Sequence, residues 1–360
     1  MRSVRNDAFF SRILQSIGAR YFPPPSFALW LRSAVVIRLN DHEPERSKIP
    51  VPRRLVHRTN RMVHAMNEPV DPGRFVIGTA QFGLKYGIAN RGGQMSLDAA
   101  RSILSRARAD GICMLDTAAL YGDSELRLGE LGVDGWQIVT KLPPLPEKHS
   151  ANAEFWVNQQ IDRSLAKLKL DRVHAVLLHR PGQLLDSAGP ALFAALAKLR
   201  DKGLVEKIGI SIYEPDELEN IWRKYRFDIV QAPLNVMDRR LEQSGWLSRL
   251  TRDRCEVHVR SIFLQGLLTL RHLPKDLARW QALWDQWHDF LVLHDISALD
   301  ACLGYILSLP EVAKIVIGVD SEAHLKELMS TASCCSEKWP ATLWSDDREL
   351  LNPSRWPTNS

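Results

Sequence analysis

The chain has 360 residues, of which 45% are hydrophobic, and a formal net charge of +5; this length and apolar content support one large core. Its five cysteines show neither the spacing of a metal site nor the framework of a secreted disulfide-rich domain. The apolar stretch 27–39 is too short for a transmembrane helix and contains Arg32 and Arg38, and no secretory signal is recognisable. We therefore expect a cytoplasmic protein with reduced thiols and no transmembrane segment.

Positive charge is concentrated at the N-terminus. Residues 1–66 hold 12 Lys or Arg against 4 Asp or Glu, a net of +8, so the rest of the chain carries about −3. We expect 1–66 to be a basic, poorly ordered extension whose charge says little about the partner of the remaining chain. Two alternatives stay open for residues 1–20: an amphipathic helix that touches anionic membrane or nucleic acid, and a targeting presequence. No specific nucleic-acid partner is expected.

Downstream, short apolar runs alternate with helical periodicity. The runs expected to be strands are 76–78, 112–115, 138–140, 173–178, 207–210, 229–231, 257–260 and 315–317. The segments expected to be helices are 97–109, 153–168, 190–202, 215–225 and 241–250. This alternation predicts an α/β fold, a single parallel (β/α)8 TIM barrel over 67–336, with a C-terminal tail at 337–360. No Gly-x-Gly-x-x-Gly follows a strand, which disfavours a Rossmann domain.

Tryptophans recur in two segments near the C-terminus. The first segment, between the seventh and eighth runs, has helical spacing and predicts a helix that packs against the barrel or forms a wall of a substrate pocket; it contains Trp280, Trp284 and Trp287. The second is the tail, which is expected to cover the active-site mouth or to run along the barrel wall; it contains Trp339, Trp344 and Trp356.

Four ionisable residues stand at or near the carboxyl ends of three successive predicted strands: Asp116, Tyr121, Lys141 and His179. Because these ends converge on the functional face of a parallel barrel, we expect the four side chains to meet. A Tyr has a pKa of about 10, so it needs a neighbour such as Lys141 to favour its phenolate, and Asp116 would keep that Lys charged. His179 would aim a substrate oxygen or share a proton.

Such a group is a general acid/base device for interconverting a carbonyl and an alcohol. No side chain delivers hydride, so a nicotinamide cofactor is implied. Each residue also has a structural alternative: a helix cap for Asp116, packing for Tyr121, a solvated strand end for Lys141 and a satisfied polar contact for His179. The joint occurrence of the four favours catalysis.

Several further motifs occur in a fixed order between about residues 75 and 328. They are Gly78-Thr79-Ala80-Gln81-Phe82-Gly83, Asp116-Thr117-Ala118, Tyr121-Gly122, Ser124-Glu125, Thr140-Lys141, Leu177-Leu178-His179-Arg180-Pro181, Gly209-Ile210-Ser211, Val230-Gln231 and Ile317-Gly318. In these motifs the chain resembles the aldo-keto reductases. The resemblance implies that Tyr121 is the proton donor, that Asp116 and Lys141 tune it, and that His179 orients the substrate carbonyl.

The resemblance also implies an NAD(P)H site and no metal. The residues it assigns to the cofactor are Gly78 and Thr79 beneath the nicotinamide ring, Asp116 beside it, Ser211 and Gln231 at the carboxamide, Ser261 and Gly266 near the pyrophosphate, and Gly318 in the last strand motif. Arg260 stands where many members have a stacking Tyr or Trp. A planar guanidinium can also stack on an aromatic ring.

The last strand motif departs from the pattern that the resemblance implies. Asp320, followed by Ser321, stands where the family commonly has a Lys or Arg for the adenosine 2′-phosphate. A carboxylate repels a phosphate and accepts hydrogen bonds from a ribose hydroxyl, which favours NADH over NADPH. The alternative is that Asp320 or Ser321 caps the helix that follows. Leu328 replaces an Asn that often touches adenine.

The leading hypothesis is therefore an NAD(P)H-dependent oxidoreductase that reduces an aldehyde or ketone to an alcohol. The sequence of residues 83–90 resembles that of a branch of the aldo-keto reductases associated with sugar metabolism. This resemblance indicates a polar, sugar-like carbonyl substrate. The alternative hypothesis is a catalytically weak, dinucleotide-binding regulator or adaptor that acts on a protein partner, because one fold hosts many functions.

Overall fold

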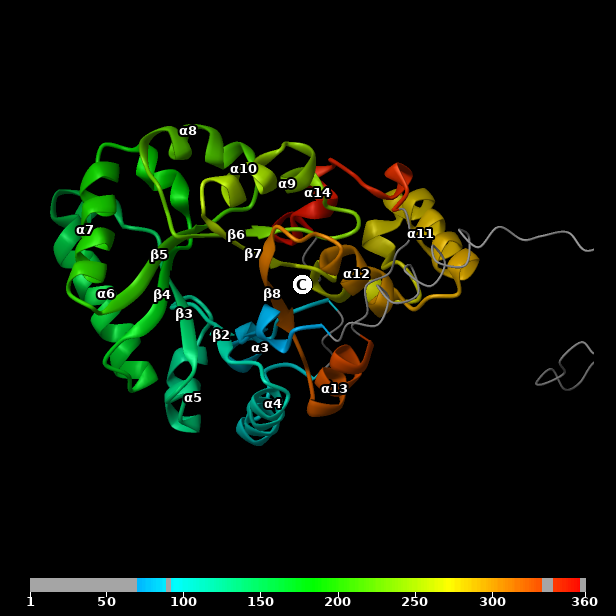
Figure 1. The fold of residues 1–360 in the computed structure, drawn as a ribbon, viewed down its shortest axis with the longest axis horizontal. Helices are drawn as coiled ribbons and strands as arrows, with labels where there is room; N and C mark the ends of the chain where they lie inside the picture. Colours follow the sequence, from blue (N-terminus) through cyan, green and yellow to red (C-terminus); the bar gives the residue numbers. More distant parts are fainter. Residues whose placement is uncertain (1–69, 89–91, 332–338, 357–360) are drawn as a thin grey trace, which may run out of the picture. The chain divides into compact units, whose positions relative to one another are not determined.

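The structure is a computed structural model that describes residues 70–88, 92–331 and 339–356, so the predictions for 1–66 lie outside it. It contains a closed barrel of eight parallel strands in chain order (Figure 1). The strands are β1 (Phe75–Gly78), β2 (Met114–Asp116), β3 (Gln137–Leu142), β4 (Val173–Leu178), β5 (Val205–Ser211), β6 (Ile229–Pro233), β7 (Glu256–Arg260) and β8 (Val312–Gly318). Pairing of β8 with β1 closes the barrel, which confirms the predicted fold class.

Helices connect the strands and surround the barrel. The α-helices are α3 (Ala80–Gly83), α4 (Leu97–Ala109), α5 (Ser124–Leu131), α6 (Ala153–Leu168), α7 (Gly189–Asp201), α8 (Asp216–Lys224), α9 (Arg240–Gln243), α10 (Trp246–Arg252), α11 (Gln281–His294), α12 (Ala298–Leu307), α13 (Glu322–Thr331) and α14 (Arg348–Leu351). The short 3₁₀ helices are η1 (Pro72–Arg74), η2 (Glu147–Asn152), η3 (Pro181–Leu185), η4 (Leu264–Thr269), η5 (Lys275–Trp280), η6 (Ala341–Leu343) and η7 (Pro353–Arg355).

Helix α4 illustrates why these segments become helices. The Ser96 hydroxyl accepts a hydrogen bond from the Ala99 amide and caps the N-terminus. The residues that α4 buries recur every three or four positions, so one face packs against the barrel while the other meets solvent; they are Ala100, Ile103, Leu104 and Ala107.

Four helices were not expected, namely α5, α12 and the single turns α3 and α14, and one expected helix is divided. The apolar residues of α12 surround its whole circumference and nearly all are buried, so the helix has no amphipathic period to recognise. Helix α5 is short, and its Leu126 is exposed, which blurs the apolar stripe. The expected helix at 241–250 is broken between α9 and α10, because Gly245 adopts the left-handed conformation (φ 75°).

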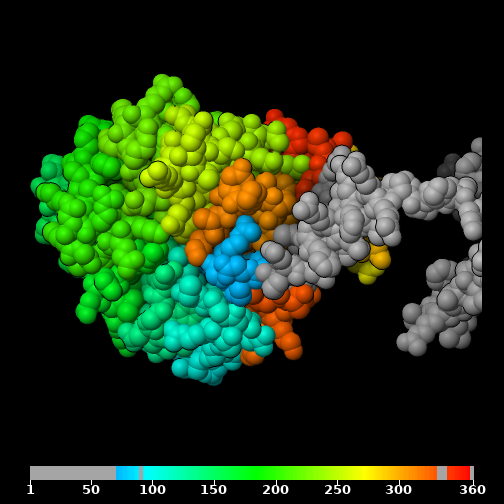
Figure 2. All heavy atoms as spheres, in the orientation of Figure 1, coloured from blue at the N-terminus to red at the C-terminus, as the bar shows by residue number. Residues whose placement is uncertain are grey.

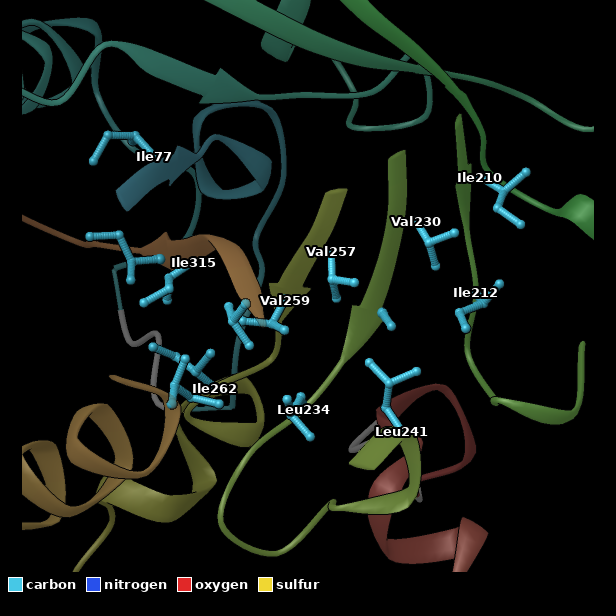
Figure 3. Close-up of a cluster of buried hydrophobic side chains, with 14 of the residues drawn as sticks. Ile77, Ile210, Ile212, Val230, Leu234, Leu241, Val257, Val259, Ile262 and Ile315 are labelled. Carbon is cyan, nitrogen blue, oxygen red and sulfur yellow. The ribbon is translucent and has the colours of Figure 1, made fainter. Parts of the chain in front are cut away.

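The core has two layers, separated by the barrel wall. The larger layer lies between strands and helices, and Figure 3 shows part of it, including Ile210, Val230 and Val257 from neighbouring strands. The smaller layer fills the barrel interior with Val76, Met114, Val139, Ala175, Leu177 and Ile229. Side chains in a strand alternate between the two faces, so the residue two positions after an interior one also points inward. Asp116, Lys141 and Gln231 follow Met114, Val139 and Ile229 in this way and lie above the apolar interior.

Strand β1 lies between β2 and β8 in the closed barrel. In Figure 2 the segment from β1 to α3 (blue) lies between the β8 and α13 region (orange) and the α4 and α5 region (cyan). The pairing of β1 with both β2 and β8 accounts for this arrangement.

The tryptophan segment forms η5 and α11, in agreement with the predicted helix. Trp284 and Trp287 are buried, and the Trp287 indole donates to the Leu268 carbonyl (3.1 Å). This helix packs on the core and contributes no residue to the wall of the cavity described below.

The C-terminal tail packs beside this helix. The Trp339 ring lies 5.6 Å from the Phe290 ring, and the Trp280 indole donates to Asp347 (2.8 Å). Figure 1 shows α14 near α9, and η6 contacts α11. No described residue of the tail lines the cavity described below. Of the two expected arrangements, the structure therefore shows the tail packed on the barrel's surrounding helices.

Within the described ranges no single helix has both the length and the apolarity to cross a bilayer. Only Lys275–His294 and Ala298–Leu307 taken together meet that standard of length and composition, and they are bent by 89° at their junction.

Candidate active site

The four predicted site residues meet at the carboxyl ends of β2, β3 and β4. Asp116 is the last residue of β2, Lys141 lies near the end of β3, and His179 directly follows β4. Tyr121 lies in the loop between β2 and α5. The prediction that these side chains converge agrees with the structure.

A buried ion pair joins two of them. The Lys141 ammonium donates to Asp116 Oδ2 (2.6 Å) and to the Thr117 carbonyl (2.9 Å), and both side chains are at least 95% buried. The Gln231 amide donates to Asp116 Oδ1 (2.7 Å), so both carboxylate oxygens accept a hydrogen bond. Burial lowers the pKa of Lys141, while the charge of Asp116 acts in the opposite direction.

Tyr121 completes the group from the β2 loop. Lys141 Nζ lies 3.5 Å from the Tyr121 hydroxyl, and the Tyr121 and His179 rings meet edge to face with centroids 5.8 Å apart. The sequence-based expectation that the pKa of Tyr121 is lowered is wrong. Burial raises the pKa of Tyr121, and the negative charge of Asp116 raises it further, so the phenol holds its proton.

His179 is a neutral side chain at the edge of this group. Burial and the positive charges of Lys141 and Arg260 lower the pKa of His179 to about 4. Its Nδ1 atom is buried and has no hydrogen-bond partner among the described residues. A neutral imidazole beside the Tyr121 phenol offers a polar group that a substrate oxygen can use.

A close approach between two loops fixes the position of Tyr121. A Cβ atom built on Gly83 would lie 1.8 Å from the Tyr121 carbonyl oxygen and 2.5 Å from the Ser124 amide nitrogen. Gly122, which has a φ of 59°, in turn has no room for a side chain, because its Cβ would lie 2.3 Å from the Gly83 carbonyl oxygen. Only glycine at both positions lets the α3 backbone touch the Tyr121 loop.

A buried hydroxyl network supports the same loop from below. The Ser124 hydroxyl lies within hydrogen-bond distance of the Thr79 and Thr117 hydroxyls (2.9 and 3.1 Å). The Thr140 hydroxyl donates to Glu125 (2.7 Å), a carboxylate that is 2% exposed. Apart from Thr79, these residues were identified from the sequence only as members of motifs, and their contacts show that they hold α5 against the strands.

A cavity opens beside Tyr121 and runs to the start of α13. Nine of the residues predicted for catalysis or the cofactor line it: Gly78, Thr79, Asp116, Tyr121, Arg260, Ser261, Gly266, Gly318 and Asp320. Ser211 and Gln231 are buried beside Asp116 and are not among its lining residues; their side chains share a hydrogen bond of 3.4 Å. Leu328 is fully buried and also lies away from the wall.

Hydrogen bonds at the start of α13 distinguish between the two alternatives for Asp320 and Ser321, a helix cap and a cofactor contact. The Ser321 hydroxyl accepts from the His324 amide (3.1 Å), as a helix cap does. The Asp320 carboxylate instead lines the cavity and accepts from the Gln81 amide (3.4 Å). Ser321 is therefore the cap of α13, and Asp320 faces the space where a ligand would bind.

Other lining residues were missed at the sequence level, because they lie on loops and come together only in three dimensions. The Gln265 amide donates to the Tyr86 hydroxyl (3.1 Å), which joins the β1 loop to the β7 loop. His324 lines the far end next to Asp320. Tyr86 belongs to the segment 83–90 noted above, but no periodic or motif signal marks Gln265 or His324 in the sequence.

The residues that line the cavity suit a dinucleotide. Gly78 and Gly318 expose backbone on its wall, and a Cβ on Gly318 would come within 2.8 Å of the Gln81 amide, so these positions leave space that side chains would fill. Polar side chains lie along its length, from Tyr121 and Arg260 at one end to Asp320 and His324 at the other. In the described part of the chain no three His, Cys, Asp or Glu side chains are grouped as metal ligands.

A parallel eight-stranded barrel with these four residues beside a cavity places the protein in the carbonyl oxidoreductase class of barrel enzymes. The family model for the Aldo/keto reductase family matches residues 74–334. The chain therefore belongs to the aldo/keto reductase family and is an NAD(P)H-dependent oxidoreductase, which confirms the resemblance seen in its motifs.

Individual relatives agree with this assignment. The D-threo-aldose 1-dehydrogenase of a Pseudomonas species is 27% identical over 319 residues, which cover 77% of this chain and 96% of that protein. The 6-dehydroglucose reductase of Novosphingobium aromaticivorans is 33% identical over 144 residues, which cover 35% and 45% of the two chains. The holo form of aldo-keto reductase AKR11C1 from Bacillus halodurans has the same fold, with a TM-score of 0.56, 19% identity, and coverage of 77% and 90%.

Proposed function

We propose that the protein reduces the carbonyl group of a polar, sugar-like aldehyde or ketone to an alcohol, with Tyr121 as the proton donor. The observation that carries this proposal is the contact of a protonated phenol with a buried Lys141–Asp116 pair at the wall of the cavity. The same arrangement favours an enzyme over the alternative of a catalytically weak regulator, because a mere binding module has no need of a buried acid/base group.

Each member of the quartet has one role in this proposal. A bound nicotinamide dinucleotide supplies the hydride that the carbonyl carbon accepts. Tyr121 donates its hydroxyl proton to the carbonyl oxygen, and the charge of Lys141 stabilises the phenolate that remains. Asp116 holds Lys141 in place, and His179 donates a hydrogen bond to the substrate oxygen and orients it.

The cofactor residues follow from the cavity. Gly78 and Thr79 form the wall next to Asp116 and Tyr121, Ser261 and Gly266 contribute the β7 loop, and Gly318 leads to Asp320. We assign the carboxamide to Ser211 and Gln231, whose mutual hydrogen bond of 3.4 Å is long enough to exchange for one to a ligand. The catalytic unit in this proposal is the barrel of residues 67–336.

The preferred cofactor in this proposal is NADH. The Asp320 carboxylate lines the adenosine end of the cavity, where it would repel a 2′-phosphate and accept a hydrogen bond from a free ribose hydroxyl. Replacing Asp320 with Asn removes the repulsion, so the ratio of NADPH to NADH affinity should rise in this variant.

The sugar-like substrate rests on two relatives. Their names describe an aldose dehydrogenase and a dehydroglucose reductase, so both act on sugars or sugar derivatives. Around Tyr121 the cavity wall offers the hydroxyl of Tyr86 and the guanidinium of Arg260, which suit a substrate rich in hydroxyl groups.

The experiment follows NADH consumption by the purified full chain with a panel of aldoses, keto sugars and apolar aldehydes. Turnover at enzymic rates, highest with the sugar carbonyls, is the expected result. Tight NADH binding without turnover of any carbonyl would contradict the proposal and support a dinucleotide-binding regulator.

A further inference from the structure

Arg260 brings a single unneutralised positive charge to the hydride-transfer end of the cavity. Its guanidinium donates to the Ile212 carbonyl (3.0 Å) and to the Ser261 hydroxyl (3.3 Å), and it lies over the Tyr213 ring at 4.7 Å. These contacts hold the group against the cavity wall without neutralising it. No carboxylate of the described residues lies within ion-pair distance of it, whereas Lys141 has Asp116.

The other groups at this end carry no net charge. The charges of Lys141 and Asp116 sum to zero, whether the proton between them resides on the Lys141 nitrogen or on the Asp116 carboxylate. His179 is neutral at physiological pH, because burial and nearby cations lower its pKa to about 4, and the buried Tyr121 phenol is protonated. The part of the cavity wall that contains Tyr121 therefore has a net charge of about +1, and this charge belongs to Arg260. Arg180, whose positive charge also acts on His179, is exposed and does not line the cavity.

The position of Arg260 relative to the reaction follows from the cavity. Hydride reaches the same carbonyl whose oxygen Tyr121 protonates, so the nicotinamide ring must lie next to Tyr121. Arg260 and Tyr121 line the same cavity, and the positive charge of Arg260 acts on the pKa of Tyr121, Lys141 and His179 alike. The guanidinium is thus a close electrostatic neighbour of the ring.

We propose that Arg260 makes the site bind the reduced nicotinamide more tightly than the oxidised one, and so sets the protein to work as a reductase. The reduced ring is neutral, and the oxidised ring carries one positive charge. A nearby like charge in a partly buried site changes a binding constant by about tenfold. This inference rests on the proposed function, and it adds the direction of the reaction.

The charge also bears on product release. During reduction the hydride leaves the ring with a positive charge, and the proton leaves Tyr121 as a phenolate, so the net charge of the site does not change. Once Tyr121 has regained a proton from water, an oxidised ring bound in the cavity would add a second positive charge to that of Arg260. Arg260 therefore favours departure of the oxidised dinucleotide after each reduction.

The test measures the dissociation constants of NADH and NAD⁺ for the full chain by fluorescence and calorimetry. For Arg260→Gln we expect the ratio of the NAD⁺ constant to the NADH constant to fall about tenfold, mainly through tighter NAD⁺ binding. Arg260→Lys keeps the charge and should retain most of the wild-type ratio. Arg252→Gln removes an equal charge from an exposed position on α10 and should leave the ratio unchanged.

Two outcomes would overturn the inference in different ways. An unchanged ratio in Arg260→Gln, with both forms bound, would refute the role of Arg260 and leave the reductase proposal intact. Failure of the wild-type chain to bind either form would refute the proposed function and this inference together. If Arg260→Gln does not fold, Arg260→Met, which retains an unbranched apolar side chain over Tyr213, carries the same test.

Discussion

At the scale of single residues, the site depends on a charge pair that is removed from water. A buried pair contributes little net stability compared with apolar residues, but loss of one partner leaves an uncompensated charge. Lys141 is fully buried and lies beneath Tyr121, so its state of charge acts directly on the phenol. This pair therefore links the stability of the barrel interior to its chemistry.

Replacing Asp116 with Asn should destabilise the protein by about 3–5 kcal/mol, because Lys141 then lacks its counter-ion. Urea unfolding measures this loss. In the double variant Asp116→Asn, Lys141→Met most of the stability should return while carbonyl reduction stays low. Equal stability of the single and double variants would show that the charge of Lys141 is not the cause.

His179 should make the protein sensitive to acid. Its pKa is about 4 in the folded protein and about 6.5 in an unfolded chain, so between these values the unfolded chain binds more protons. Stability is therefore unaffected above about pH 6.5 and falls as the pH drops toward 4. Between about pH 7.5 and pH 5 the wild type should lose about 2 kcal/mol more than His179→Gln in urea unfolding. Equal losses of unfolding free energy in the wild type and in His179→Gln would contradict the lowered pKa of His179.

At the scale of elements, the alternation of strands and helices could be predicted because the spacing of apolar residues differs between strands and helices. Strand runs such as 173–178 and helices such as 153–168 agree with the structure to the residue. The convergence of Asp116, Lys141 and His179 followed from one rule of parallel barrels. Helix α12 could not be found by periodicity, since it is apolar on every side.

The contacts between loops were beyond prediction for a different reason. Gln265 and Tyr86 meet although 179 positions separate them, and no local pattern encodes their hydrogen bond. The apolar environment that raises the pKa of Tyr121 is likewise a property of the assembled barrel, which is why reasoning from Lys141 alone gave the wrong direction.

The close approach of α3 to the Tyr121 loop gives a test at this scale. Gly83→Ala should force the two backbones apart, destabilise the protein by about 1–3 kcal/mol, and lower the rate of reduction by displacing Tyr121. Gly182→Ala is the matched control, because its Cβ meets nothing within 4 Å. If Gly83→Ala has the stability and turnover of Gly182→Ala, the loop contact does not position Tyr121.

At the scale of the whole molecule, the C-terminal tail adds to the core without reaching the cavity. Leu350 and Leu351 are each 2% exposed, and Arg348 pairs with Asp216 at the start of α8 (2.7 Å). The tail therefore contributes to stability through buried apolar area, and its tryptophans stabilise the surrounding helices.

Leu351→Ala should cost about 2–5 kcal/mol of unfolding free energy while the KM for the carbonyl substrate and the affinity for NADH stay unchanged. Thermal unfolding and steady-state kinetics on the same preparation measure both quantities. A large rise in KM with little loss of stability would instead place the tail over the active site.

The account as a whole depends on Tyr121 as the group that protonates the carbonyl oxygen. The most direct measurement is the single-turnover rate of NADH oxidation by a sugar aldehyde, in the wild type and in Tyr121→Phe, with NADH affinity measured alongside. We expect the variant to bind NADH normally and to transfer hydride about 10²- to 10⁴-fold more slowly. Wild-type hydride transfer in Tyr121→Phe would contradict the account.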